Sequence, residues 1–345
     1  MSVRLETPAR ATNGDYELGL SSITSLHVIL TFKCNYRCTF CFQPDFKQTL
    51  DPSVWREKLV PLYPQLRQAT LHGGEPTVGP LFPEFVALVS AHNDTCRFNM
   101  FTNGARFDDY WIDLMLRRGG FANFSLNAHS REVYDKLHGH GRYDDVRANL
   151  AALLAARRDS DSLLSVETSM VVLPENVAEL PEFTAWAIDV GLNGIRYFVD
   201  MQQMPPATDE TLRAVDAAIE IADGARGSGF WIWGLGNLRG KLTRMPIPEH
   251  ELESFGCRRT FTNLYVAVNG NVSFCNFLEG RPIGNLTTQD LEEIWNSEPA
   301  LAQRGAQDRG EWTYCISQYC GPAGTAVAKG PRTAEIPLTV LDRRR

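Results

Sequence analysis

The chain has 345 residues, of which 43% are hydrophobic and 22% are charged, and its formal net charge at pH 7 is −7. This composition can supply a full hydrophobic core, with room for one large domain and a smaller one. An acidic balance without a basic block argues against a nucleic-acid surface, and no apolar run approaches the roughly 18 residues of a transmembrane helix. The N-terminus has no signal-peptide pattern, so we expect a cytoplasmic protein with neither nucleic acid nor membrane as a partner.

The first predicted strand, residues 26–32, leads directly into three cysteines. Cys34, Cys38 and Cys41 are separated by three and then by two residues. Three thiolates at this spacing on one loop can bind three irons of a cubane [4Fe-4S] cluster and leave the fourth iron open for a ligand from outside the protein. A structural zinc site is the alternative, but it needs a fourth Cys or His, and none follows before His72.

The second predicted strand, residues 68–72, ends in the Gly-Gly-Glu-Pro segment 73–76. Two glycines at a strand end are also typical of an ordinary turn. Together with the cysteine triplet, and with Phe40 just before its last cysteine, this segment resembles the radical S-adenosylmethionine (SAM) superfamily. The resemblance implies that the open iron binds the amino and carboxylate groups of SAM. Reductive cleavage then yields a 5'-deoxyadenosyl radical that takes hydrogen from an unactivated C-H bond.

Strand-like and helix-like segments alternate along the first two thirds of the chain. Such alternation is typical of βα units, and right-handed crossovers between parallel strands build an α/β sheet. The resemblance adds the specific form, a partial (β/α)6 barrel of the TIM type. The remaining predicted strands cover 97–101, 121–127, 163–172 and 194–200, and the predicted helices lie near 52–62, 82–92, 108–118, 142–157, 177–190 and 208–225.

Active sites of such barrels lie at the C-terminal ends of the strands, where the motifs of this chain fall. The resemblance implies that Phe40 lies near the adenine of SAM. It also implies that the segment with Gly73, Gly74 and Glu75 binds SAM, with the backbone of the two glycines meeting the methionine amino group.

The fourth predicted strand supplies two more candidates. The resemblance places Ser125 and Asn127 near the ribose of SAM. Many relatives have Asp where this chain has Asn127, so that residue has the alternative of facing the substrate. Further candidates for ordering the substrate or moving a proton are polar residues at strand ends, each of which also fits a purely structural role: His72, His129, Glu167, Thr168, Asp200 and Gln202.

Cys96 stands apart from the cysteine triplet, just before the third predicted strand. Buried packing is the ordinary role of such a cysteine. Cys96 becomes the residue to test only if the reaction is an epimerisation, in which a protein thiol returns hydrogen to the opposite face of the substrate.

Toward the C-terminus a second group of cysteines follows. Seven of the eight cysteines thus lie in two groups, which in a chain without a leader indicates metal ligation and not disulfides. One of the second group lies on the returning strand of a hairpin predicted from the pair Asn269-Gly270, and a short amphipathic helix ending at Trp295 follows. The group consists of Cys257, Cys275, Cys315 and Cys320.

This hairpin, the second cysteine group and the Gly-Asn-Leu run 284–286 resemble the C-terminal SPASM domain of the superfamily and its shortened form, twitch. A full SPASM domain has seven cysteines, so the four here imply one auxiliary [4Fe-4S] cluster bound by them. A structural zinc on the same cysteines is the alternative. The spacing between Cys315 and Cys320 departs from the two residues common in relatives, which leaves the fourth ligand open.

We therefore expect an N-terminal extension over 1–24, a radical SAM barrel over 25–235, an α+β auxiliary-cluster domain with a β-hairpin over 236–325 and a tail over 326–345. The two resemblances imply a radical SAM oxidoreductase in which the auxiliary cluster carries electrons to or from the active site. A flavodoxin- or ferredoxin-like protein is the expected reductant.

The first hypothesis for the substrate is a ribosomally made peptide, matured in natural-product biosynthesis, because relatives with auxiliary clusters often modify peptides. Only about 25 residues precede the first predicted strand, too few for a peptide-binding module. That shortage points either to a separate peptide-recognition protein or to the second hypothesis, dehydrogenation or epimerisation of a small polar metabolite such as an aminocyclitol or sugar. A third hypothesis is an iron-sulfur scaffold without catalysis.

Overall fold

The structure is a computed structural model that describes residues 16–43, 45–139, 142–199, 203–243, 259–278 and 280–309. Within these ranges, all named strands belong to one sheet. The tail predicted over 326–345 lies outside the described residues, as does most of the extension predicted over 1–24. No helix in the described part of the chain is long and apolar enough to span a membrane.

Six parallel strands lie on the six predicted ones, and their ends differ by a few residues. A seventh, β7, is only three residues long, too short to show the alternation by which a strand is recognised. The sheet order is β10-β9-β8-β1-β2-β3-β4-β5-β6-β7. The parallel strands are β1 (Ser25–Ile29), β2 (Gln68–His72), β3 (Arg97–Thr102), β4 (Gly119–Ser125), β5 (Ser165–Val172), β6 (Gly194–Val199) and β7 (Trp231–Trp233).

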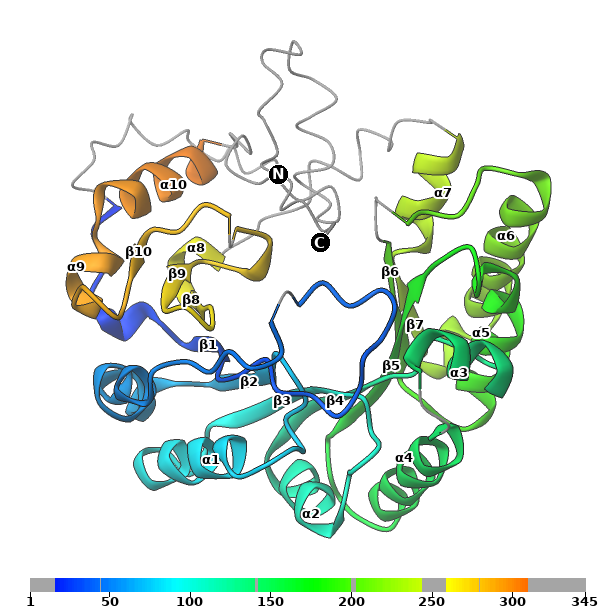
Figure 1. The fold of residues 1–345 in the computed structure, drawn as a ribbon, viewed down its shortest axis with the longest axis horizontal. Coiled ribbons are helices and arrows are strands. Elements are labelled where there is room, and N and C mark those ends of the chain that lie inside the picture. Colours follow the sequence, from blue (N-terminus) through cyan, green and yellow to red (C-terminus); the bar gives the residue numbers. More distant parts are fainter. Residues whose placement is uncertain are drawn as a thin grey trace, which may run out of the picture.

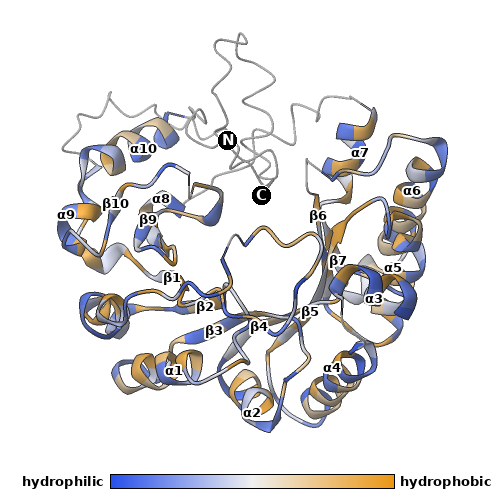
Figure 2. Ribbon diagram, in the orientation of Figure 1, coloured by the Kyte–Doolittle hydropathy of each residue, from blue (hydrophilic) through white to orange (hydrophobic). Residues whose placement is uncertain are grey.

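The connecting helices cover the outer face of the curved sheet, which stays open and so forms the expected partial barrel (Figure 1). Their apolar sides face the strands and their polar sides face outward (Figure 2). Helices on predicted segments are α1 (Leu81–His92), α2 (Asp109–Arg118), α4 (Tyr143–Arg158), α5 (Leu180–Asp189) and α6 (Asp209–Gly224), whereas α3 (Arg131–His138) and α7 (Leu235–Thr243) are additional.

The helix predicted near 52–62 differs from its expected form. Val54–Lys58 is a π-helical turn, and Val60–Gln65 is a 3-10 helix. Pro61 and Pro64 explain the difference, because each removes a backbone N–H that an α-helix would use. By contrast, the segment predicted at 142–157 is a regular α-helix, and its apolar residues at helical spacing, Val146, Leu150, Leu153 and Leu154, are all buried.

The hairpin predicted around Asn269-Gly270 is present. Strands β8 (Asn263–Val266) and β9 (Asn271–Ser273) are antiparallel, and Gly270 adopts the positive φ of 82° that the turn requires. Strand β8 also pairs in parallel with β1, so the hairpin extends the barrel sheet and covers the edge that β1 would otherwise expose. The other elements here are β10 (Gly284–Asn285), α8 (Arg259–Thr262), α9 (Leu291–Trp295) and α10 (Glu298–Asp308).

Candidate active site

The three cysteines of the first group lie on one loop, the cysteine loop (residues 33–43). Backbone hydrogen bonds close its base, from Phe32 N–H to Gln48 O at 2.9 Å and from Leu50 N–H to Leu30 O at 2.8 Å. The loop crosses in front of the strands in the centre of Figure 1. Its tip is held against the end of α3, since Thr39 N–H donates to the carbonyl of Leu137 at 2.9 Å.

Cys34, Cys38 and Cys41 are half-buried residues and form no disulfide. The Sγ of Cys34 accepts a hydrogen bond from Tyr36 N–H at 3.3 Å. Burial raises the pKa of the Cys34 thiol to about 11. Burial also raises the pKa of Cys38, and the thiols of Cys41 and Cys34 add to that rise. Cluster assembly must therefore displace protons from these thiols.

This donor set fits a cubane cluster. Three thiolates of such a cluster bind three different irons, so their sulfur atoms need not meet at one point. In the described part of the chain, no group of three His, Cys, Asp or Glu side chains is close enough to hold a single metal ion. Soft thiolates and a backbone N–H aimed at sulfur are the surroundings that iron-sulfur clusters use.

His138 is a residue at this site that sequence reasoning missed. Its Nδ1 lies 3.0 Å from Cys38 Sγ, and its Nε2 lies 3.0 Å from the carbonyl of Leu126. The ring is buried, and the ring of Phe40 packs edge-on against it at 5.7 Å. His138 ends α3 just before Gly139, which caps the helix with a φ of 70°. Ser130 before the helix and Gly139 after it were the available sequence signals.

The two glycines after β2 run beside the cysteine loop. Gly74 N–H donates to Thr31 O at 2.8 Å, and the following N–H, of Glu75, donates to Lys33 O at 2.9 Å. A Cβ on Gly74 would lie 2.0 Å from Lys33 O, and Gly73 has a φ of 132°. Only glycine permits this approach of two backbones. The contact of this segment with the amino-acid part of SAM stays a prediction.

Glu75 is buried, and protein donors surround its carboxylate. Oε1 accepts from the hydroxyls of Thr102 at 2.6 Å and Thr77 at 2.8 Å, and Oε2 accepts from Asn103 N–H at 2.6 Å. Burial raises the pKa of Glu75, and these hydrogen bonds oppose that rise. The carboxylate joins the ends of β2 and β3 and holds Asn103, whose Nδ2 lies 3.8 Å from Cys34 Sγ.

Ser125 is the last residue of β4 and Asn127 follows it, but the two residues differ in exposure. Ser125 is half-buried, and its hydroxyl lies 3.4 Å from that of Ser169 on β5. Asn127 is 2% exposed with a φ of 59°, a conformation that Asn tolerates. Its Oδ1 accepts from Val171 N–H at 2.8 Å, so its amide ties β4 to β5. The contact of either residue with ribose stays a prediction.

Two further candidates lie elsewhere than at the mouth, the edge formed by the C-terminal ends of β1 to β6. The hydroxyl of Thr168 is buried and donates to Phe124 O at 2.8 Å. Cys96 precedes β3, at the opposite end of the strand, where it is fully buried with its Sγ 3.6 Å from Arg97 O. Burial raises the Cys96 pKa to about 11. These contacts are those of packing residues.

His72 and His129 both lie near strand ends. The ring of His72 packs edge-on against His27 at 5.4 Å, and its Nε2 is buried without a partner in the described structure. Burial lowers the pKa of His72 to about 4 and that of His27 well below its ordinary value. His129 donates its backbone N–H to Glu179 at 2.7 Å.

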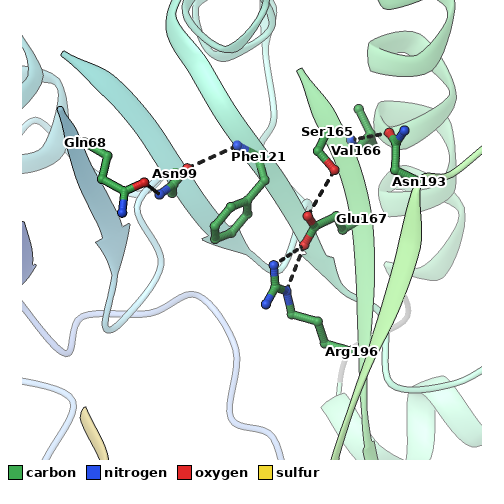
Figure 3. Close-up of polar contacts among 8 residues, drawn as sticks. All are labelled: Gln68, Asn99, Phe121, Ser165, Val166, Glu167, Asn193 and Arg196. Carbon is green, nitrogen blue, oxygen red and sulfur yellow. Dashed lines mark hydrogen bonds and ion pairs between the residues drawn. The ribbon is translucent and has the colours of Figure 1, made fainter. Parts of the chain in front are cut away.

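Glu167 lies on the inner wall of the barrel and forms an ion pair with Arg196 of β6 at 2.8 Å (Figure 3). Sequence reasoning singled out Glu167 but missed Arg196, which stands in an ordinary strand pattern with no motif around it.

Cys275, just after β9, is buried and is the one member of the second cysteine group that the described residues include. The remaining predicted site residues lie outside the described residues: Asp200, Gln202, Cys257, Cys315 and Cys320.

Two family models match the chain. The radical SAM superfamily model matches residues 28–221, and the SPASM model, an iron-sulfur cluster-binding domain, matches residues 257–321. Mycofactocin maturase MftC of Mycobacterium tuberculosis is 30% identical over 184 residues, which cover 51% of this chain and 44% of that protein. GTP 3',8-cyclase of Chlorobaculum tepidum is 29% identical over 168 residues, 47% of this chain and 49% of the cyclase. The chain spans about half the length of these curated relatives.

Solved structures share the fold. Streptococcus suis SuiB bound to its precursor peptide SuiA superposes with a TM-score of 0.60 at 16% identity, over 82% of this chain and 67% of SuiB. The anSMEcpe structure with bound AdoMet and Cp18Cys peptide has a TM-score of 0.62 at 14% identity, over 88% of this chain and 90% of that one. The chain therefore belongs to the radical SAM superfamily and carries a C-terminal SPASM match, which makes SAM and [4Fe-4S] clusters its cofactors.

Proposed function

We propose that this chain is a peptide maturase that oxidises a ribosomally made peptide by two electrons. The observation that carries the proposal is the SPASM match at 257–321 behind the barrel, because net oxidation needs an acceptor for the electron left on the substrate. The relatives add support: one is named a maturase, and the solved structures of SuiB and anSMEcpe hold peptides. A flavodoxin- or ferredoxin-like protein would supply the priming electron, and a separate protein would recognise the peptide.

Cys34, Cys38 and Cys41 would hold the cluster that binds SAM, and the cluster and SAM together would supply a carbon radical able to abstract hydrogen from a C-H bond. The backbone of Gly73 and Gly74 would contact the methionine amino group of SAM. The cysteine loop lies across the mouth and would limit the access of water to the carbon radical. Cys257, Cys275, Cys315 and Cys320 would hold the auxiliary cluster.

Anaerobic reconstitution with iron and sulfide tests the cofactor side of the proposal. We expect about eight irons in the wild type and about four in the Cys34/Cys38/Cys41→Ala triple variant, with cleavage of SAM by dithionite lost in the variant. About four irons in the wild type and none in the variant would remove the auxiliary cluster and with it the oxidation. The substrate side is tested by incubation with candidate precursor peptides and mass spectrometry, where loss of two hydrogens is expected.

A small polar metabolite is the second candidate, and the inner wall offers an observation in its favour. Thr70 Oγ1 and both amide atoms of Asn123 are buried without partners in the described structure, and hydroxyl or amino groups of a sugar-like substrate would satisfy them. Oxidation of an aminocyclitol or sugar pool with no change in any peptide would favour this candidate. Epimerisation is less favoured, because Cys96 lies at the end of β3 away from the mouth.

A further inference from the structure

The inner wall carries an ion pair that packing alone does not require. Arg196 directs both Nε and Nη2 to Glu167 Oε2 at 2.8 Å, and Ser165 donates its hydroxyl to Glu167 Oε1 at 3.0 Å (Figure 3). The side chains are 28% exposed for Arg196 and 5% for Glu167. Apolar residues of similar volume would stabilise a barrel wall as well or better. The pair is therefore better explained by binding than by folding.

Aromatic rings hold the guanidinium in one plane. Its central carbon lies 4.8 Å from the ring centroid of Phe121, 5.1 Å from that of Trp231 and 6.0 Å from that of Phe101. Two of its nitrogen atoms are engaged by Glu167, whereas Nη1 has no partner among the described residues. A planar, rigid fork with one free edge is a pre-organised hydrogen-bond donor.

The strand register places this donor on the active-site side of the wall. Arg196 on β6 is the partner of Ser169 on β5, and Ser169 is the partner of Ser125 at the C-terminal end of β4. Ser125 is the residue predicted to lie near SAM. The guanidinium of Arg196 contacts Glu167 and the ring of Phe121. These two residues lie nearer the starts of β5 and β4 than Ser169 and Ser125 do. A group bound by Nη1 would thus lie inside the barrel, deeper than the predicted SAM contact at Ser125.

The charges of the wall favour a neutral acceptor over an anion. Glu167 already neutralises Arg196, so a bound carboxylate would add an uncompensated negative charge at a partly desolvated site. The nearby imidazoles of His27 and His72 do not supply the missing cation, because burial lowers their pKa values and leaves them neutral near pH 7. A planar amide carbonyl accepts from Nη1 without adding charge and fits between aromatic rings.

We propose that Arg196 binds a backbone amide carbonyl of the substrate and that Glu167 is its positioning residue. This inference rests on the proposed peptide maturase, since it names the group by which that site would recognise a peptide.

The test uses the full, reconstituted chain with SAM and two small probes, N-acetylglycine N-methylamide and acetate. Binding is followed by saturation-transfer NMR, which detects the roughly millimolar affinity expected of so small a ligand. We expect the wild type to bind the amide probe and acetate not to displace it. Arg196→Gln should weaken amide binding about tenfold, a loss of about 1.4 kcal/mol. Arg239→Gln, which breaks an exposed ion pair with Asp216, is the matched control and should bind like the wild type.

Glu167→Gln gives a readout that a merely structural role would not move. With the neutralising charge removed, the variant should lose amide binding and gain acetate binding. Arg196→Lys keeps the charge without the planar fork and should recover only part of the amide binding. Equal amide binding by the wild type and Arg196→Gln, displacement of the amide by acetate in the wild type, or no binding by the wild type would each overturn the proposal.

The outcome is separable from that of the proposed function. Arg196-dependent amide binding without oxidation of any peptide would support the amide site and contradict the proposed maturase function. Peptide oxidation that proceeds unchanged in Arg196→Gln would support the maturase function and contradict the amide site.

Discussion

Two regions of the barrel are built in different ways. Beside the cysteine loop, the site is fixed by close packing: the backbone of Gly74 lies so close to Lys33 that no side chain fits between them. The carboxylate of Glu75 there accepts hydrogen bonds from N–H and hydroxyl groups of the protein itself. On β5 and β6, the site is made of side chains, and Glu167 and Arg196 stand on ordinary strands. The first region cannot change without disturbing the fold, whereas the second can change its ligand preference while the strands stay in place.

The largest expected effect is that of Gly74→Ala. Its Cβ would lie 2.0 Å from the carbonyl oxygen of Lys33, and both partners are backbone that cannot rotate away. We expect a loss of about 3 kcal/mol or more in the free energy of unfolding, together with lower iron uptake on reconstitution. Chemical denaturation and iron analysis measure these effects. Gly236→Ala, at a position in α7 with nothing within 4 Å, is the control and should cost nothing.

Removal of one partner of the inner ion pair should lower the free energy of unfolding by less than Gly74→Ala does. Glu167→Ala leaves Arg196 as an uncompensated, partly buried charge, for which we expect a loss of about 2 kcal/mol in the free energy of unfolding. The double variant Glu167→Leu with Arg196→Met should recover most of the lost free energy of unfolding. Asp113→Ala breaks an exposed pair with Arg117 and should cost less than about 0.5 kcal/mol. A double variant no more stable than the single one would show that the pair itself stabilises the fold.

The pH dependence of stability tests the buried wall between the two regions. His72 has a pKa of about 4 in the folded protein, below the ordinary value of about 6.5 expected in the unfolded chain. Because the unfolded chain binds the proton more tightly, stability is fully present above pH 6.5 and falls as the pH drops toward 4. Between pH 7 and pH 5, we expect the loss to be about 2 kcal/mol smaller in His72→Gln than in the wild type. His92→Gln, at an exposed position, should follow the wild-type profile.

The smallest effect is expected at the hairpin turn. Gly270→Ala places a Cβ 2.7 Å from the methyl group of Thr287 at a φ of 82°, which should cost about 1 kcal/mol. Gly229 has a similar φ of 83° with nothing within 4 Å, so Gly229→Ala measures the backbone strain alone. An equal cost at the two positions would mean that the contact with Thr287 contributes nothing. Thermal unfolding of both variants makes the comparison.

Most of the parallel strands and the hairpin were predictable because each depends on a local pattern. The helix predicted near 52–62 came out as π and 3-10 turns because Pro61 and Pro64 act on the hydrogen bonds of the segment and not on its apolar period. Strand β7 is too short to show a pattern. The pairing of β8 with β1 joins residues far apart in the chain, and no local sequence pattern predicts it.

The sequence by itself determined the cofactor chemistry, because the cysteine spacing and the adjacent glycines are local requirements of a cluster loop and of a close backbone approach. Only the tertiary structure decided what surrounds them. It brought His138 to Cys38 from the end of α3, gave the amide of Asn127 an internal partner, and paired Arg196 with Glu167 inside the barrel. Such contacts depend on which faces of distant strands and helices meet, and that is settled by packing of the whole chain.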